Sequence, residues 1–290
     1  MDGGTAQVGE QDVTLATADG RTLAATRFTP ARVGRPPVLI APATAVRRGY
    51  YARFARFLAG LGHPVLTLDY RGVGGSLQGP VRRYRARMQD WGRQDLDAAL
   101  RHVAEWQPGQ APLVVAHSVG GQVLPLAESA HTVAGLYLVA SQSGAPRHWK
   151  GLDKAKLAAF WYGLVPVLTR LHGHLPGYAM GSEPLPLGIA REWARWGRHP
   201  DYILGHLPEL RDRFKALSFP IRQVSFSDDF YCPEPAAAEL LSWYGGTAKT
   251  HRHLRPADIG AKAIGHFGYF RDRFAAALWQ DAADWLAAPR

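Results

Sequence analysis

Short apolar runs alternate with longer amphipathic stretches along most of this chain. Short runs typical of buried strands are found at Pro37–Ala41, Pro64–Asp69, Pro112–Ala116, Ala134–Ala140 and Pro220–Phe226, and a further parallel strand is predicted at the more polar Thr247–Leu254. Stretches with helical periodicity are found at Tyr50–Leu61, Trp91–Trp106, Val119–Ser129, Pro235–Trp243 and Tyr269–Ala287. Two alternating segments, Asp12–Thr17 and Thr22–Phe28, precede them and predict an antiparallel edge. The whole pattern predicts an α/β fold, with a mostly parallel central sheet and helices on both faces.

The alternation stops between Ala140 and Pro220, where the sequence becomes helical and rich in aromatic residues. We therefore predict a helical cap at residues 143–216, inserted between two parts of one α/β core at residues 1–142 and 217–290. Some large side chains of this insertion are candidates for lining an apolar pocket, although we expect most of them to pack the cap onto the core. The candidates are Trp149, Phe160, Trp161, Tyr162, Leu164, Tyr178, Met180, Trp193 and Trp196.

One apolar run ends abruptly in a serine, at Val114-Val115-Ala116-His117-Ser118-Val119-Gly120-Gly121. A serine on a tight strand-to-helix turn needs very small residues two positions before and after it, because larger side chains would collide. Ala116 and Gly120 meet this requirement. The pattern predicts a nucleophile elbow at Ser118, whereas the pentapeptide alone is equally typical of an ordinary strand-to-helix turn.

A serine nucleophile needs a base and a group that orients the base. Two carboxylates, Asp228 and Asp229, follow the strand at Pro220–Phe226, and His266 lies in a glycine-flanked loop before the last predicted helix. Only one of two adjacent carboxylates leaving a strand can face the histidine, because their side chains point in roughly opposite directions. Ser118, one of these two aspartates and His266 therefore form a candidate triad.

Several segments together resemble the α/β hydrolases of the serine-hydrolase type, close to a bacterial group of predicted hydrolases and serine-aminopeptidase-like proteins. Pro37–Thr44 resembles a strand and loop that usually end in His-Gly, here replaced by Pro42-Ala43. Leu66–Ser76 resembles the Asp-x-Arg-Gly-x-Gly-x-Ser turn of that superfamily, and His266–Arg271 resembles the histidine signature of the bacterial group. The triad order of serine, aspartate and histidine also matches this fold.

The resemblance implies the α/β-hydrolase fold and a role for several further residues. In relatives the acid commonly lies four residues before a proline, which selects Asp229 over Asp228 because Pro233 follows at that spacing. The backbone N–H groups of Val119 and Thr44 would form the oxyanion hole, with Ala43 as the alternative to Thr44. An insertion after the sixth strand would lie over the carboxyl edge of the sheet. We expect the substrate pocket to include Trp161, Trp193, Tyr162, Phe230 and Phe267.

The amino-acid composition limits the classes of binding partner that we expect. The net charge of +10 comes largely from 28 arginines that are spread along the chain, so we expect no nucleic-acid partner. The positive net charge is compatible with an anionic substrate or an acidic carrier protein, and both stay as alternatives. Met1–Glu10 has no signal-peptide pattern, and the apolar stretch Leu157–Leu168 is too short to span a bilayer, so we expect a cytoplasmic protein without an integral membrane segment.

No cofactor or metal is predicted. The histidine pairs His172/His174 and His251/His253 lack a third ligand at a diagnostic spacing, and the Gly72–Gly75 run does not match a dinucleotide fingerprint. The single cysteine, Cys232, cannot form an intrachain disulfide and is expected to be a small packed residue.

These observations predict a metal-independent serine hydrolase that cleaves a carboxylic ester or related acyl bond through an acyl-Ser118 intermediate. The substrate would be a small molecule with an apolar acyl group. Thioesterase, acyltransferase and peptidase reactions use the same triad and stay open as alternatives. A non-catalytic ligand-binding protein on the same fold is the alternative from another class.

Overall fold

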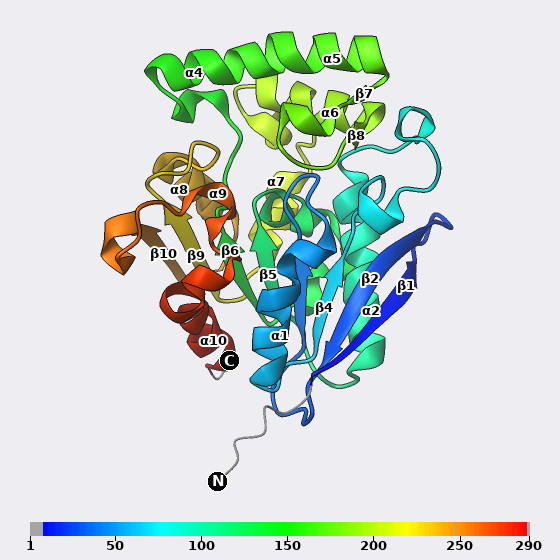
Figure 1. Ribbon diagram of the computed structural model, residues 1–290, viewed down its shortest axis with the longest axis vertical. Coiled ribbons are helices and arrows are strands. Elements are labelled where there is room, and N and C mark those ends of the chain that lie inside the picture. The colour runs from blue at the N-terminus through cyan, green and yellow to red at the C-terminus, as the bar shows by residue number, and fades with distance from the viewer. Residues whose placement is uncertain (1–7, 247, 289–290) are drawn as a thin grey trace.

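The computed structural model describes residues 8–246 and 248–288. Most of Met1–Glu10, where a signal peptide would begin, and Thr247, at the start of the last predicted strand, therefore lie outside the described residues. An eight-stranded sheet forms the centre of the molecule (Figure 1). Its strands in chain order are β1 (Gly9–Ala16), β2 (Thr22–Thr29), β3 (Val38–Ala41), β4 (Val65–Leu68), β5 (Leu113–His117), β6 (Gly135–Val139), β9 (Ile221–Phe226) and β10 (Lys249–Leu254).

The order of strands across the sheet is β1-β2-β4-β3-β5-β6-β9-β10. The pairs β1/β2 and β2/β4 are antiparallel, and every other neighbouring pair is parallel. Strands β3, β4, β5 and β6 are buried throughout, as expected for parallel strands covered on both faces. The predicted α/β fold with an antiparallel edge is confirmed.

Helices cover both faces of the sheet. Alternate side chains of β5 enter two separate apolar cores, with Val114 and Ala116 in one and Leu113 and Val115 in the other. The first core is shared with α2 (Asp97–Trp106), α3 (Val119–Val123), α7 (Leu210–Ala216) and most of the buried face of α8 (Glu234–Trp243). The second core is shared with α1 (Ala52–Gly60) and α10 (Gln280–Ala287).

Two predicted helices are shorter than expected. The helix predicted at Val119–Ser129 ends at Val123, because Pro125 has no N–H to donate to the carbonyl of Gly121. The Tyr244 hydroxyl donates to that carbonyl instead, at 2.7 Å. The last helix, predicted from Tyr269, has regular α geometry only in α10, after a short 3-10 turn and a wider π-helical segment at Ala275–Trp279.

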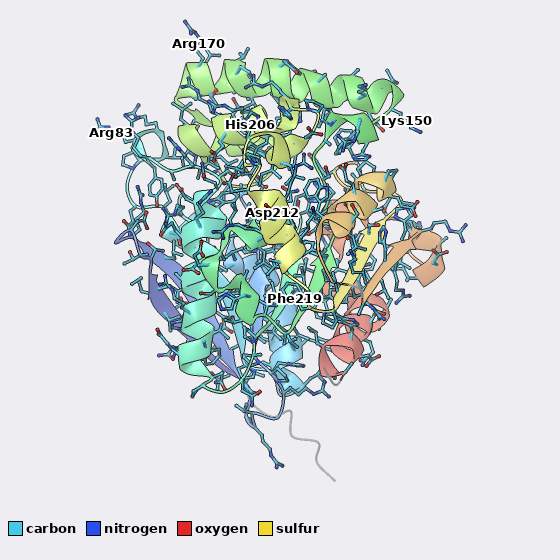
Figure 2. The ribbon with its side chains drawn as sticks, turned by 180° about the vertical axis from the view of Figure 1, so that it is seen from behind. Arg83, Lys150, Arg170, His206, Asp212 and Phe219 are labelled. Carbon is cyan, nitrogen blue, oxygen red and sulfur yellow. The ribbon has the colours of Figure 1, made fainter. Side chains whose placement is uncertain are left out.

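A mostly helical insertion follows β6 and lies above the carboxyl ends of the parallel strands (Figure 1). It contains α4 (Gly151–Ala158), a π-helical segment (Ala159–Leu164), α5 (Val165–His172), α6 (Leu187–Arg198) and α7, with a two-residue strand pair, β7 (His174–Leu175) and β8 (Leu185–Pro186), that the sequence did not predict. The first three segments form one long rod, which we call the α4–α5 rod. Figure 2 shows Lys150 and Arg170 at its two ends. Within residues 8–246 and 248–288, no helix combines the length and the apolar character needed to cross a membrane.

Candidate active site

Ser118 occupies the turn between β5 and α3. Its backbone has φ 53° and ψ −115°, a conformation that a non-glycine residue keeps only when the surrounding structure holds it. The residue two positions after Ser118 must be small, because a Cβ on Gly120 would lie 2.7 Å from the carbonyl oxygen of Ala41. The turn thus has the strained strand-to-helix geometry that the sequence pattern requires.

Asp229 and His266 form a direct pair although 37 residues separate them. Asp229 lies just beyond β9, and His266 belongs to the single-turn helix α9 (Gly265–Gly268) rather than to a loop. The distance from Asp229 Oδ2 to His266 Nδ1 is 2.7 Å, and the two side chains are 0% and 6% exposed. Because a carboxylate only accepts hydrogen bonds, Nδ1 carries the proton and Nε2 is left as the acceptor.

The other oxygen of Asp229 is held by backbone. Oδ1 accepts the N–H of Tyr231 at 2.8 Å and that of Cys232 at 3.2 Å. Cys232 is fully buried, as predicted for a packed residue, and burial raises the pKa of its thiol well above the usual value. Both oxygens of Asp229 therefore have fixed partners, which orients the carboxylate toward His266.

Asp228 faces a different group. Its Oδ2 accepts the backbone N–H groups of Ile264 at 2.7 Å and Gly265 at 3.0 Å, the two residues immediately before His266. The adjacent carboxylates thus point apart, as strand alternation predicts. Asp229 contacts the imidazole, and Asp228 holds the start of the helix that carries it.

Two backbone N–H groups are candidates for binding an oxyanion. Val119 is the first residue of α3, and the first N–H groups of a helix have no partner within the helix. The N–H of Ala43 donates to the Tyr51 hydroxyl at 2.8 Å, so Ala43 is engaged elsewhere. Among the described residues, no hydrogen bond joins the Thr44 N–H to a protein acceptor. This difference favours Thr44 over Ala43.

Sequence analysis missed His117, which is fully buried beside Ser118. Its Nε2 donates to the carbonyl of His266 at 2.9 Å, so its Nδ1 accepts the hydroxyl proton of Tyr51, also at 2.9 Å. Burial lowers the pKa of His117 well below its usual value and keeps the ring neutral. Ala43, Tyr51, His117 and His266 are thereby linked in one chain of hydrogen bonds. Only its position beside Ser118 could have drawn attention to His117.

A small cavity of about 50 Å³ brings Ser118 and His266 together with Thr44. Gln142, Met180 and Trp193 also line it, as do Ala43, Ser182, Tyr231 and Phe267. No direct hydrogen bond joins the Ser118 and His266 side chains within the described part of the chain. Such contacts are often loose before substrate binds. The predicted Ser118, Thr44 and His266 therefore meet at one cavity.

A second cavity of about 840 Å³ lies next to the first, and Trp193 and Tyr231 line both. Trp161 and Phe230, which were predicted to line the substrate pocket, line the larger cavity, whereas Phe267 lines only the smaller one. The rest of its apolar wall comes mainly from Trp149, Leu157 and Phe160.

The prediction that Tyr162 lines the pocket needs correction. Its side chain is 64% exposed and lines neither cavity. The neighbouring Trp161 takes the inward position, because it packs so closely on α6 that a Cβ on Gly197 would lie 2.3 Å from its ring. Consecutive residues of a helical segment point in different directions, so with Trp161 facing inward Tyr162 is turned toward solvent.

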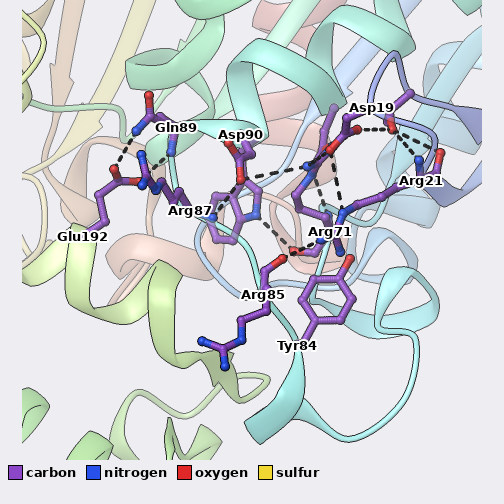
Figure 3. A network of polar contacts seen from close by, with 12 residues as sticks. Asp19, Arg21, Arg71, Tyr84, Arg85, Arg87, Gln89, Asp90 and Glu192 are labelled. Carbon is purple, nitrogen blue, oxygen red and sulfur yellow. Dashed lines mark hydrogen bonds and ion pairs between the residues drawn. The ribbon is translucent and has the colours of Figure 1, made fainter.

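A polar contact joins the insertion to the core at α6, next to Trp193 in the sequence (Figure 3). Glu192, the preceding residue on α6, accepts the backbone N–H of Gln89 at 3.0 Å and its side-chain amide at 2.8 Å. The segment containing Gln89 continues into a polar network in which the buried Arg71 binds the buried Asp95 at 2.6 Å and the exposed Asp19 at 2.8 Å. Glu192 thus fixes α6 to the core, and the Trp193 ring packs edge-on against Phe160 and Trp161 of the rod.

The two histidine pairs have other partners. His251 and His253 both lie 2.8 Å from the Ser225 hydroxyl, and His172 contacts Tyr178. The residues that the structure describes contain no group of three or more His, Cys, Asp or Glu side chains arranged to hold a metal ion.

Comparisons with known proteins identify the family and the fold. Residues 35–181 match the family model for serine aminopeptidase S33. The fold resembles a soluble variant of monoglyceride lipase from Saccharomyces cerevisiae, solved with a substrate analog (TM-score 0.70, 14% identity, covering 100% of this chain and 98% of that chain). It also resembles an esterase from Exiguobacterium antarcticum (TM-score 0.62, 14% identity, 96% and 100% covered). At such identities the likeness shows a shared fold. No curated protein matches the sequence.

Proposed function

The chain belongs to the serine aminopeptidase S33 family of α/β hydrolases, and on that premise we propose that it is a metal-independent serine hydrolase acting on a carboxylic ester with an apolar acyl group. One observation carries the proposal: Ser118 shares a cavity with His266, which is paired with the buried Asp229 at 2.7 Å. Residues 143–216 form the cap in this proposal.

The first half of the reaction acylates the enzyme. Ser118 Oγ attacks the acyl carbonyl carbon, and His266 Nε2 accepts the hydroxyl proton. The negative charge that develops on the carbonyl oxygen is stabilised by the N–H groups of Val119 and Thr44. Collapse of this intermediate expels the alkoxide, which takes the proton from His266. Asp229 keeps the imidazole in the required tautomer and stabilises its charged form.

The second half hydrolyses the acyl-enzyme. Water attacks the ester carbonyl of acyl-Ser118 while His266 Nε2 takes one of its protons. The same N–H groups stabilise the oxyanion, and the proton returns to Ser118 as the carboxylic acid leaves. A thiol or amine acceptor in place of water would give acyl transfer with the same residues, and a thioester substrate would give thioesterase activity.

The larger cavity supports an apolar acyl group. Its lining includes an apolar surface, and apolar surfaces favour burial of hydrocarbon. The residues that form this surface are Trp149, Leu157, Phe160, Trp161, Trp193 and Phe230. Trp193 and Tyr231, which border both cavities, would contact the acyl chain near the reacting carbonyl. Phe267 would contact the leaving-group side.

Hydrolysis of p-nitrophenyl esters and acyl thioesters of increasing chain length tests the proposal. The wild-type protein should hydrolyse at least one medium-chain ester, and Ser118→Ala should lower kcat by about 10³-fold or more without loss of folding. A folded Ser118→Ala variant that keeps most of the activity would exclude the mechanism. Absence of turnover across the panel would favour the ligand-binding alternative.

A further inference from the structure

Exposed apolar side chains are concentrated on the outermost part of the insertion. Among the described residues, eight large hydrophobic side chains are exposed, and six of them belong to residues 152–178. Tyr178 lies beyond the α4–α5 rod, in a 3-10 turn at Gly177–Ala179. Tyr162, although exposed, lies beside α6, where the guanidinium of Arg198 lies over its ring. The remaining four, which we call the apolar face of the α4–α5 rod, are Leu152, Leu164, Val167 and Leu171. Apolar residues scattered singly over a surface are ordinary, but a concentration on one element indicates an interaction site.

The charge pattern of the rod is equally uneven. No charged residue occurs between Leu157 and Thr169, whereas Lys150, Lys154 and Arg170 flank this stretch. None of these three cations has an ion-pair partner among the described residues. Asp153, the one acidic residue between Lys150 and Tyr178, is already paired with Lys156.

More cations lie beside the carboxyl end of the rod. Arg82 and Arg83 are exposed and unpaired within the described residues. Arg82 is close to the residue that ends the rod, since a Cβ on Gly173 would lie 3.5 Å from the Arg82 Cβ. Figure 2 shows Arg83 and Arg170 at the same corner of the molecule and Lys150 at the opposite end of the rod.

The rod is also the part of the insertion farthest from the sheet (Figure 1). Its inner side contributes Leu157, Phe160 and Trp161 to the larger cavity. One helix therefore presents an apolar outer surface with cationic ends on one side and a cavity wall on the other.

We propose that the apolar face of the α4–α5 rod is a docking surface for a lipid surface that carries anionic headgroups. The helix would lie in the plane of the interface, with the uncharged middle among the acyl chains and the flanking cations at the level of the headgroups. This function goes beyond ester hydrolysis and does not require Ser118.

The charges disfavour a second copy of the chain as the occupant. Two copies meeting through this helix about a two-fold axis would bring Lys150, Lys154 and Arg170 of both together with only Asp153 to offset them. An acidic protein would meet the cations, but the four exposed aliphatic side chains of the apolar face offer it no hydrogen-bonding groups. An anionic lipid surface satisfies both the apolar and the cationic groups.

Vesicle flotation tests the proposal with the full chain. Vesicles of phosphatidylcholine alone are compared with vesicles that also contain phosphatidylglycerol. Wild-type protein should bind the mixed vesicles at least about tenfold more strongly, since each cation near an anionic surface contributes about fivefold. Leu164→Ser/Val167→Ser/Leu171→Ser and Lys154→Glu/Arg170→Glu should each weaken this binding by about tenfold or more.

The loop before β3 lies at the amino ends of the parallel strands, away from the insertion, and supplies matched controls. Val33 is 48% exposed and Arg32 is also exposed, so Val33→Ser and Arg32→Glu should leave binding unchanged. Hydrolysis of a short water-soluble ester should be unchanged in all four variants, because none of the substituted residues lines the cavities.

Ser118→Ala separates docking from catalysis. This variant should bind mixed vesicles as the wild type does, so loss of turnover and loss of binding are independent results. Failure of the wild type to bind, equal binding to both vesicle types, or equal weakening by the control variants would overturn the docking surface. Concentration-dependent dimerisation lost in the apolar variant would assign the face to a second copy instead.

Discussion

Asparagine substitutions at the two adjacent aspartates should have very different effects on catalysis. In Asp229→Asn, one side-chain position must still accept the N–H groups of Tyr231 and Cys232, as Oδ1 does now. The amide oxygen is the only acceptor in asparagine, so it takes that position and turns the NH₂ group toward His266 Nδ1. Nδ1 must then become an acceptor, and the proton moves to Nε2.

With the proton on Nε2, the His266 ring has no lone pair facing Ser118 and cannot act as the base. His266 could no longer accept the Ser118 proton, and the negative charge that stabilises the imidazolium would also be lost. The expected loss in kcat is about 10³- to 10⁴-fold, which corresponds to about 4–5.5 kcal/mol of transition-state stabilisation.

Asp228→Asn should behave differently. Both N–H groups that Asp228 binds reach the same oxygen, Oδ2, and the single amide oxygen of asparagine can accept both. The substitution removes only the charge from these hydrogen bonds. We expect a loss of about 1–2 kcal/mol in the free energy of unfolding and a change in kcat of less than about tenfold.

The assay compares kcat for both variants on one activated ester, with circular dichroism to confirm that each is folded. A second measurement locates the histidine proton: the Nδ1–H resonance expected far downfield in wild-type protein should be present in Asp228→Asn and absent in Asp229→Asn. A larger loss of kcat for Asp228→Asn, or a retained Nδ1–H resonance in Asp229→Asn, would refute the reasoning.

Three further predictions follow from the site. Trp193→Ala should change the ratio of kcat/KM between short and medium acyl esters by about tenfold, whereas the exposed Tyr162→Ala should not; equal ratios in both variants would remove Trp193 from the acyl pocket. Because burial lowers the pKa of His117, the unfolded chain binds a proton below pH 6.5 that the folded chain excludes. Acid should therefore lower the free energy of unfolding by up to about 1.4 kcal/mol per pH unit through this group, and His117→Gln should remove that component in urea titrations; an identical pH dependence would contradict it. EDTA should leave kcat/KM unchanged, and a loss restored by added zinc would contradict a metal-independent reaction.

Local patterns predicted most of the fold. The apolar runs identified β3, β4, β5, β6 and β9, because buried parallel strands need continuous hydrophobic sequence, and the alternating segments identified β1 and β2. The strained turn at Ser118 was also predictable, since the sizes of Ala116 and Gly120 are read directly from the sequence. The helix after Ser118 ends early because of Pro125, which is a local effect. The Tyr244 hydroxyl that binds the free carbonyl of Gly121 comes from a distant part of the sequence.

Contacts between distant segments were not predictable. The bonds of His117 to Tyr51 and His266 span 66 and 149 residues, and no local pattern encodes them. Tyr162 and Trp161 are adjacent aromatic residues, and only the packing of the π-helical segment Ala159–Leu164 against α6 decides which of them faces inward. The partners of Asp228 likewise depend on how the segment before His266 returns to the sheet.

Ser118 acts in the proposed mechanism as a nucleophile activated by His266, and covalent labelling with a fluorophosphonate measures that activation. Such a probe modifies an activated serine covalently, and mass spectrometry of the digested protein identifies the modified residue. We predict one label per chain, on Ser118, with labelling lost in Ser118→Ala and slowed by about 10³-fold or more in Asp229→Asn. An unlabelled wild-type protein, or a label on any other residue, would contradict the account.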